Sequence, residues 1–153
     1  MEVQQDFKEL LALFNAFHIK YIIVGGYALA FHGAPRMTGD IDIFVEPSED
    51  NALKILEALK EFGFGNIGLK IEDFSKKGNV VQLGVPPVRI DMLTSLTGVS
   101  WEKAYTTKKK GKYGDLFVFF ISRELLLKNK RSVGRKKDQA DVEALGDIHC
   151  LDA

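Results

Sequence analysis

Two aspartates, Asp40 and Asp42, stand two residues apart in the apolar segment Asp40-Ile41-Asp42-Ile43-Phe44-Val45. Side chains alternate between the faces of a β-strand, so a strand here places both carboxylates on one face. Ile41 and Ile43 then point to the other face, toward the core. Aspartate is a poor strand former, and like charges this close repel each other. A divalent cation between the carboxylates would offset the repulsion, so the spacing predicts a metal site.

A third carboxylate, Asp91, lies in a second apolar segment, Val88-Arg89-Ile90-Asp91-Met92-Leu93. Upstream of the aspartate pair, an apolar segment over residues 21–24 runs directly into Gly25 and Gly26. A phosphate can approach such a turn closely because glycine has no Cβ, and a helix that starts there adds its positive dipole end. The alternative is a tight strand-to-helix turn that requires positive φ. The aspartates downstream favour the phosphate interpretation.

The order of these motifs resembles the nucleotidyltransferase superfamily, which includes DNA polymerase beta and the aminoglycoside and lincosamide nucleotidyltransferases. Its members have an apolar strand, Gly-Gly or Gly-Ser, then Asp-x-Asp or Asp-x-Glu, and a third carboxylate on a later strand. The C-terminal part resembles small prokaryotic nucleotidyltransferases, including abortive-infection toxins, in the residues Asn129-Lys130, Gly134-Arg135-Lys136-Lys137-Asp138 and Asp141. The resemblance covers residues 20–45, 80–95 and 122–145.

The resemblance implies transfer of a nucleoside monophosphate from a nucleoside triphosphate to an acceptor, with release of pyrophosphate. It also implies Mg²⁺ as the cofactor, as two ions, with Mn²⁺ as a substitute. Carboxylates suit Mg²⁺, which prefers oxygen ligands. Asp40 and Asp42 are the expected ligands of both metals or of the triphosphate-bound one. Asp91 completes the acceptor-side metal and is also a candidate general base.

Arg36 and Thr38 precede the aspartate pair in Arg36-Met37-Thr38-Gly39-Asp40. Arginine is always charged and can fork onto phosphate oxygens, so Arg36 is a candidate contact of the triphosphate or the acceptor. Alternatively, it pairs with one of the aspartates and holds the loop. Thr38 belongs to the nucleotide-binding candidates by its place in the motif, although its type also suits a turn.

Positive charge is concentrated near the C-terminus, although the net charge is zero. Residues 103–137 hold twelve lysines and arginines and two acids. This segment faces a triphosphate or a nucleic acid, or it is a solvated surface. Lys130, Lys137 and Arg135 are its candidate nucleotide contacts. The acids that follow them, Asp138 and Asp141, orient these cations, or Asp138 caps the last helix and Asp141 pairs with a lysine or arginine.

Length and composition are those of a globular protein with an ordinary core. The 153 residues predict one domain, with a core over about 20–121 and C-terminal helices over about 122–147. No apolar run reaches the roughly 20 residues that span a bilayer, and the single cysteine, Cys150, cannot form an internal disulfide. We therefore expect a cytoplasmic protein without membrane contact. The histidines have no metal-ligand spacing, and His32 is expected to be a packing or helix-end residue.

The periodicity of apolar residues predicts an α/β (α+β) fold, a small mixed sheet flanked by helices. The expected helices span residues 3–17, 26–32, 48–62, 101–106, 122–130 and 138–145, and the expected strands span 21–24, 40–45, 80–85, 88–93 and 116–121. Residues 66–73 are ambiguous and favour a short strand. The lysine run 108–110, with Gly111 and Gly114, predicts a loop or a hairpin.

These observations favour a Mg²⁺-dependent nucleotidyltransferase that acts on tRNA, a protein or a small molecule. The short chain leaves little room for a second acceptor-binding domain, so a homodimer or an antitoxin partner is expected to contribute that surface. The alternative is a non-enzymatic nucleotide-binding or antitoxin-like module with the same fold. The presence of Asp40, Asp42 and Asp91 together argues against an inactive site.

Overall fold

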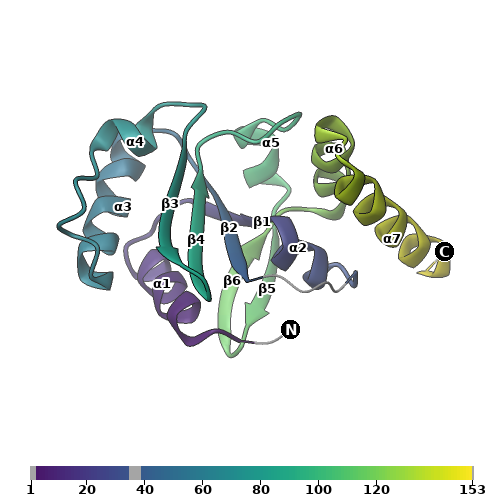
Figure 1. The fold of residues 1–153 in the computed structure, drawn as a ribbon, viewed down its shortest axis with the longest axis horizontal. Coiled ribbons are helices and arrows are strands. Elements are labelled where there is room, and N and C mark those ends of the chain that lie inside the picture. Colours follow the sequence, from purple (N-terminus) through teal and green to yellow (C-terminus); the bar gives the residue numbers. More distant parts are fainter. Residues whose placement is uncertain (1–2, 35–38, 153) are drawn as a thin grey trace.

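Six strands form one mixed sheet in the order β3-β4-β2-β1-β6-β5 (Figure 1). The structure is a computed structural model that describes residues 3–34 and 39–152, with side chains up to residue 146. The strands are β1 (Tyr21–Val24), β2 (Asp40–Val45), β3 (Val80–Val85), β4 (Val88–Leu93), β5 (Lys109–Tyr113) and β6 (Leu116–Phe120). The helices are α1 (Gln5–Ala16), α2 (Gly25–Phe31), α3 (Glu49–Phe62), α4 (Ile71–Ser75), α5 (Trp101–Thr106), α6 (Arg123–Val133) and α7 (Lys136–Asp152).

The register of the central strands determines which polar side chains meet. β2 runs antiparallel to β1 and parallel to β4. Asp42 lies opposite Asp91, and Asp40 lies opposite Arg89. Paired residues on neighbouring strands point to the same face of the sheet. The three carboxylates are therefore on one face, whereas Ile41 and Ile43 are fully buried on the other, as predicted.

Helices cover the sheet and complete the hydrophobic core. Figure 1 shows α3 and α4 at one end of the molecule, and α6 with α7 projecting at the opposite end. α3 illustrates how the sequence sets an element's limits. The Ser48 side chain caps its start by accepting the Asn51 N–H, and Gly63 ends it with φ of +112°.

The predicted fold class is confirmed, and most predicted elements occur within a few residues of their expected limits. The strand favoured within residues 66–73 is wrong, because residues 71–75 form helix α4, whose Phe74 is fully buried. Lys109 and Lys110 of the lysine run begin the edge strand β5, which forms an antiparallel hairpin with β6. Within the described part of the chain, none of the helices has the length and apolar character that crossing a membrane requires.

Candidate functional site

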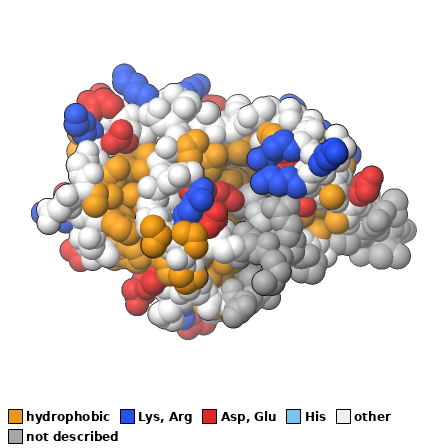
Figure 2. Space-filling model, viewed as in Figure 1, with side chains coloured by type: hydrophobic (Ala, Val, Ile, Leu, Met, Phe, Trp, Pro, Cys, Tyr) orange, Lys and Arg blue, Asp and Glu red, His pale blue; other side chains and the backbone are white. Residues whose placement is uncertain are grey.

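The three predicted carboxylates line a single pocket beside strands β2 and β4. Asp40, Asp42 and Asp91 share this cavity of about 530 Å³ with Gly25 and Gly26, which begin α2. Figure 2 shows acidic and basic side chains side by side on this face, with hydrophobic side chains around them. Three separate segments of the sequence therefore converge at one place.

Asp42 is the carboxylate most affected by these surroundings. Burial, followed by the negative charges of Asp91 and Asp40, raises the pKa of Asp42 to about 6. The positive charges of Lys130 and Lys137 act in the opposite direction but do not cancel the effect. Burial and the neighbouring carboxylates thus both oppose ionisation of Asp42, and a further cation beside it would offset both effects.

Arg89 is a member of the site that the sequence motifs did not single out. Its guanidinium donates from Nε to Asp91 Oδ1 and from a terminal nitrogen to Asp91 Oδ2, both at 3.2 Å. Nε also lies 3.7 Å from Asp40 Oδ2. The hydrogen bond and the charge of Asp91 raise the pKa of Arg89 above its usual value. Its position two residues before Asp91 on the same strand was the available signal, because that spacing places both side chains on one face.

Gly25 allows the backbone to pass close to the Asp42 carboxylate. Its φ is +67°, a conformation that residues with a Cβ rarely adopt. A Cβ added at Gly25 would also collide with the Asp42 carboxylate oxygen. The positive-φ turn weighed from the sequence is therefore present, and it brings the start of α2 against the aspartate.

Lys130 enters the same pocket from α6 and is almost completely buried. Its ammonium lies 3.4 Å from Asp138 Oδ1 and 3.2 Å from Asp141 Oδ2, both on α7. The pairing of Asp141 with a lysine was one of the two predicted alternatives. These ion pairs fix the position of a cation whose charge acts on Asp42.

Asp138 is fully buried between two cations. Burial by itself would raise the pKa of Asp138, but the Arg135 hydrogen bond and the Lys130 charge outweigh it and hold that pKa below its usual value. The carboxylate also accepts the backbone N–H of Arg135, just before α7 begins at Lys136. Asp138 thus satisfies a backbone donor at the start of the last helix and orients two side chains.

The remaining predicted cations differ in their placement. Lys137 and Arg135 line the carboxylate pocket together with Lys130. Arg36 and Thr38 lie outside the described residues. The pocket further contains residues of the β4–α5 connection and of α6 that the motifs did not mark as ligands; these are Ser95, Leu96, Thr97 and Val133.

The donor set fits a divalent cation after one rearrangement. Carboxylate oxygens on adjacent strands are the ligands that Mg²⁺ prefers. Among the described residues, no group of three or more His, Cys, Asp or Glu side chains stands ready to hold a metal ion. Instead, the Arg89 guanidinium lies against both Asp40 and Asp91. A metal would therefore have to replace Arg89 as the counter-ion of these carboxylates.

Comparison with protein families identifies the chain. Residues 10–119 match the sequence model described as "Nucleotidyl transferase AbiEii toxin, Type IV TA system". The protein belongs to this AbiEii family. Membership confirms the enzyme class predicted from Gly25-Gly26 and Asp40-x-Asp42, a nucleotidyltransferase, and the resemblance to toxins of the abortive-infection type. The matched segment contains β1 to β5 and all of β6 except its last residue, Phe120. Helices α6 and α7 lie beyond its end.

Solved structures resemble this AbiEii-family protein over nearly its whole length. The lincosamide antibiotic adenylyltransferase LnuA, bound to lincomycin, has 16% identity and a TM-score of 0.58, over 95% of this chain and 97% of its own. The antibiotic-resistance factor ANT(2'')-Ia has 13% identity and a TM-score of 0.59, over 97% and 82%. An antigenic nucleotidyltransferase-like protein from Paracoccidioides brasiliensis has 18% identity and a TM-score of 0.56, over 97% and 78%. No curated protein sequence matches. At these identities the likeness establishes the fold.

Proposed function

We propose that the protein transfers a nucleoside monophosphate from a nucleoside triphosphate to an acceptor in a Mg²⁺-dependent reaction that releases pyrophosphate. The observation that carries this proposal is the single pocket in which three carboxylates face a buried lysine. The raised pKa of Asp42 supports it, since the pocket favours added positive charge. Phosphoryl and nucleotidyl transfer depend mainly on positioning and charge neutralisation, which such a pocket provides.

Asp40, Asp42 and Asp91 are the residues that would hold the metal. Bound Mg²⁺ would neutralise triphosphate charge and lower the pKa of the attacking hydroxyl. Arg89, released from Asp91, together with Lys130 and Lys137, would then be cations of the described residues available to the phosphates. Because Asp138 and Asp141 hold Lys130 in place, its ammonium does not have to be ordered when the nucleotide binds.

The family places the protein in toxin–antitoxin biology, and we propose an intracellular macromolecule, tRNA or protein, as its acceptor. An antitoxin encoded with it is the proposed regulatory partner. A homodimer, in which a second copy would contribute to the acceptor surface, is a further proposal. The likeness to a lincosamide antibiotic adenylyltransferase makes a small-molecule acceptor the competing proposal.

The test is incubation of the protein with each α-³²P-labelled nucleoside triphosphate, Mg²⁺, and either total tRNA or cell lysate. We expect label on one class of macromolecule with one nucleotide, and loss of labelling in Asp42→Asn. Asp50→Asn is the matched control, because Asp50 lies on α3 and pairs with exposed Lys54. Labelling that survives in Asp42→Asn would refute the assignment of the carboxylates.

A further inference from the structure

The β5–β6 hairpin displays lysines and aromatic rings on a common face. Lys110 lies opposite Phe119 and Lys112 lies opposite Phe117 in the antiparallel register. The Lys110 and Lys112 ammonium groups stand 4.6 and 5.1 Å from the Phe117 ring centroid. Lys108 lies 5.1 Å from the Phe119 ring but is held by Tyr105, since its ammonium stands 3.7 Å from that ring and donates to the Tyr105 carbonyl. The face therefore alternates positive charge with aromatic surface.

Neither charge pairing nor edge protection accounts for this face. Lysines 108, 109, 110 and 112 form no ion pair with a carboxylate of the described residues. Lysines on an edge strand such as β5 discourage pairing with other sheets. That role does not require an exposed ring beneath them, yet Phe117 is 52% exposed. Cations beside an exposed aromatic ring are the combination that binds single-stranded nucleic acid, because the cations contact phosphates and the bases stack on the ring.

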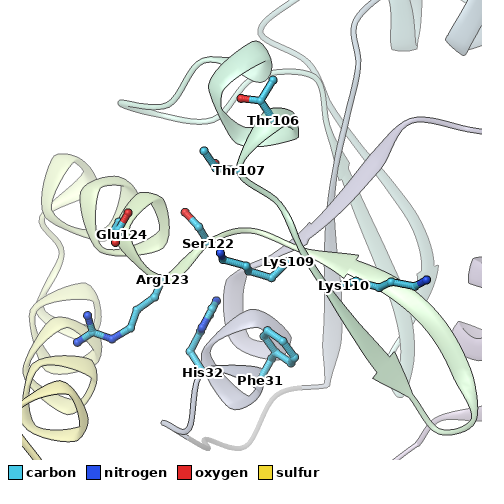
Figure 3. A pocket seen from close by; sticks show the side chains of 9 residues that line it. All are labelled: Phe31, His32, Thr106, Thr107, Lys109, Lys110, Ser122, Arg123 and Glu124. Atoms are coloured by element: carbon cyan, nitrogen blue, oxygen red, sulfur yellow. The ribbon is translucent and has the colours of Figure 1, made fainter. Parts of the chain in front are cut away.

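A second pocket adjoins the hairpin and contains hydroxyl and cationic groups. Its volume is about 760 Å³, and it lies between the end of α2, the start of β5 and the start of α6. Figure 3 shows His32 and Lys109 pointing toward Ser122, whereas Arg123 is turned toward α7 and Lys110 points away. The Arg123 guanidinium donates to the Leu145 carbonyl, so Lys109 is the cation directed at the pocket.

His32 offers a hydrogen-bond acceptor in this pocket. Its Nε2 donates to the Ile121 carbonyl at 2.7 Å. Burial, followed by the charges of Arg123 and Lys109, holds the pKa of His32 below its usual value. In neutral imidazole with a proton on Nε2, Nδ1 is the hydrogen-bond acceptor of the ring, and Thr106 and Thr107 add hydroxyl oxygens to the pocket lining. Acceptors of this kind suit the 2′-hydroxyl that distinguishes RNA from DNA.

The two pockets are connected by two helices. Gly25 and Gly26 at the start of α2 line the carboxylate pocket, whereas Phe31 and His32 at its end line the second. Seven helical residues at about 1.5 Å each span roughly 10 Å. On α6, Arg123 lines the second pocket and Lys130 the first, a similar separation. A strand held at the second pocket is therefore within a short reach of the carboxylates.

We propose that the β5–β6 face binds a single-stranded segment of RNA, with phosphates on Lys110 and Lys112 and a base on Phe117, and that the strand passes over the edge strand β5 to place a ribose in the pocket beside Lys109. On binding, the lysine ammonium groups move from the Phe117 ring to the phosphates, which leaves the ring available to the base. The identification of this RNA as the acceptor rests on the proposed function; binding of RNA to this surface does not.

The experiment measures fluorescence anisotropy of a short labelled oligouridylate with the full chain, without nucleotide or Mg²⁺. We expect Lys110→Ala/Lys112→Ala to weaken binding about tenfold and to reduce the salt slope by about 1.4, two phosphate contacts at about 0.7 each. Phe117→Leu should weaken binding roughly fivefold with the slope unchanged, because it removes stacking and not charge. The matched control is Lys76→Ala/Lys77→Ala, an equal loss of charge at exposed positions after α4.

Three outcomes would overturn the proposal. Equal affinity of all variants means that RNA does not use this face. Equal affinity for oligothymidylate removes the assignment to RNA. Competition by polyphosphate at the same phosphate concentration, with Phe117→Leu unaffected, leaves a simple anion surface. Asp42→Asn should bind oligouridylate normally, so a failure of the carboxylate assignment is seen separately in the transfer assay.

Discussion

At the scale of single residues, the site is a balance of charges that stand close together. Asp42 lies near two other carboxylates, and Arg89 and Lys130 supply positive charge from β4 and α6. The positive charges of Lys130 and Lys137 offset burial and repulsion only in part, since the pKa of Asp42 is still raised. The metal-free protein therefore loses stability when Asp42 is ionised. Substitutions of Asp42 and Arg89 test this electrostatic cost.

Asp42→Asn should stabilise the metal-free protein at neutral pH. A carboxyl whose folded pKa is about 6, against an ordinary 3.8, costs up to about 3 kcal/mol when it is ionised. The native state holds this proton between those values and the unfolded state does not, so stability is lost as pH rises from about 4 to 6. The gain from asparagine should be largest near pH 7 and vanish near pH 4. Urea unfolding with EDTA at several pH values measures it; a gain independent of pH would exclude this cause.

Arg89→Gln should raise the affinity for Mn²⁺ and lower the stability of the metal-free protein. The guanidinium contacts Asp40 and Asp91, the carboxylates that would bind a metal, so it competes with the metal for them. Its removal ends this competition but leaves the two carboxylates without the positive charge of Arg89. We expect affinity to increase roughly three- to tenfold, about 1 kcal/mol. Paramagnetic titration measures free Mn²⁺ directly, with Arg89→Lys as the variant that retains the charge. Unchanged affinity in the glutamine variant would show that the arginine does not compete.

At the scale of elements, sequence patterns predicted where the strands lie better than which strands and residues pair in the sheet. Apolar runs bounded by glycine or proline identified β1 to β4, and Asp40, Asp42 and Asp91 could be assigned to one face. Residues 71–75 were misread because one helical turn is too short for a period to be visible. There Asp73 accepts the Lys70 N–H, and Phe74 packs in the core. The pairing of Arg89 with Asp40 depends on strand register, which the sequence does not give.

The β1–α2 turn provides a test of how tightly this element fits the site. Gly25→Ala should cost about 2 kcal/mol or more, because positive φ and contact with the Asp42 carboxylate both oppose a Cβ. In an Asp42→Ala background the cost should shrink, since the contact is relieved and the strained φ remains. Gly39→Ala is the control, as a Cβ there meets nothing within 4 Å. Thermal unfolding of the single and double variants measures the coupling, and strict additivity would contradict the close approach.

At the scale of the whole molecule, the site is completed by the helical hairpin of α6 and α7, which lies beyond the matched family segment. α6 carries Lys130 to the carboxylates, and α7 holds it there through Asp138 and Asp141. The sequence supplied these residues as motif members but not their burial, which depends on α7 packing back on α6. The ion pairs can therefore be structural, catalytic or both, and stability measurements alone would not separate these roles.

A single and a double variant of Lys130 separate its structural role from its catalytic role. Lys130→Met alone leaves Asp138 and Asp141 with less compensation in the interior and should destabilise the protein by about 3 kcal/mol or more. Adding Asp141→Asn removes a charge that has lost its ion pair with Lys130, while Arg135 still pairs with Asp138, so much of the stability should return. If Lys130 acts on the nucleotide, the double variant should refold and still fail to transfer label. Urea unfolding and the transfer assay on the same preparations decide between the roles, because transfer restored together with stability would make Lys130 a structural residue only.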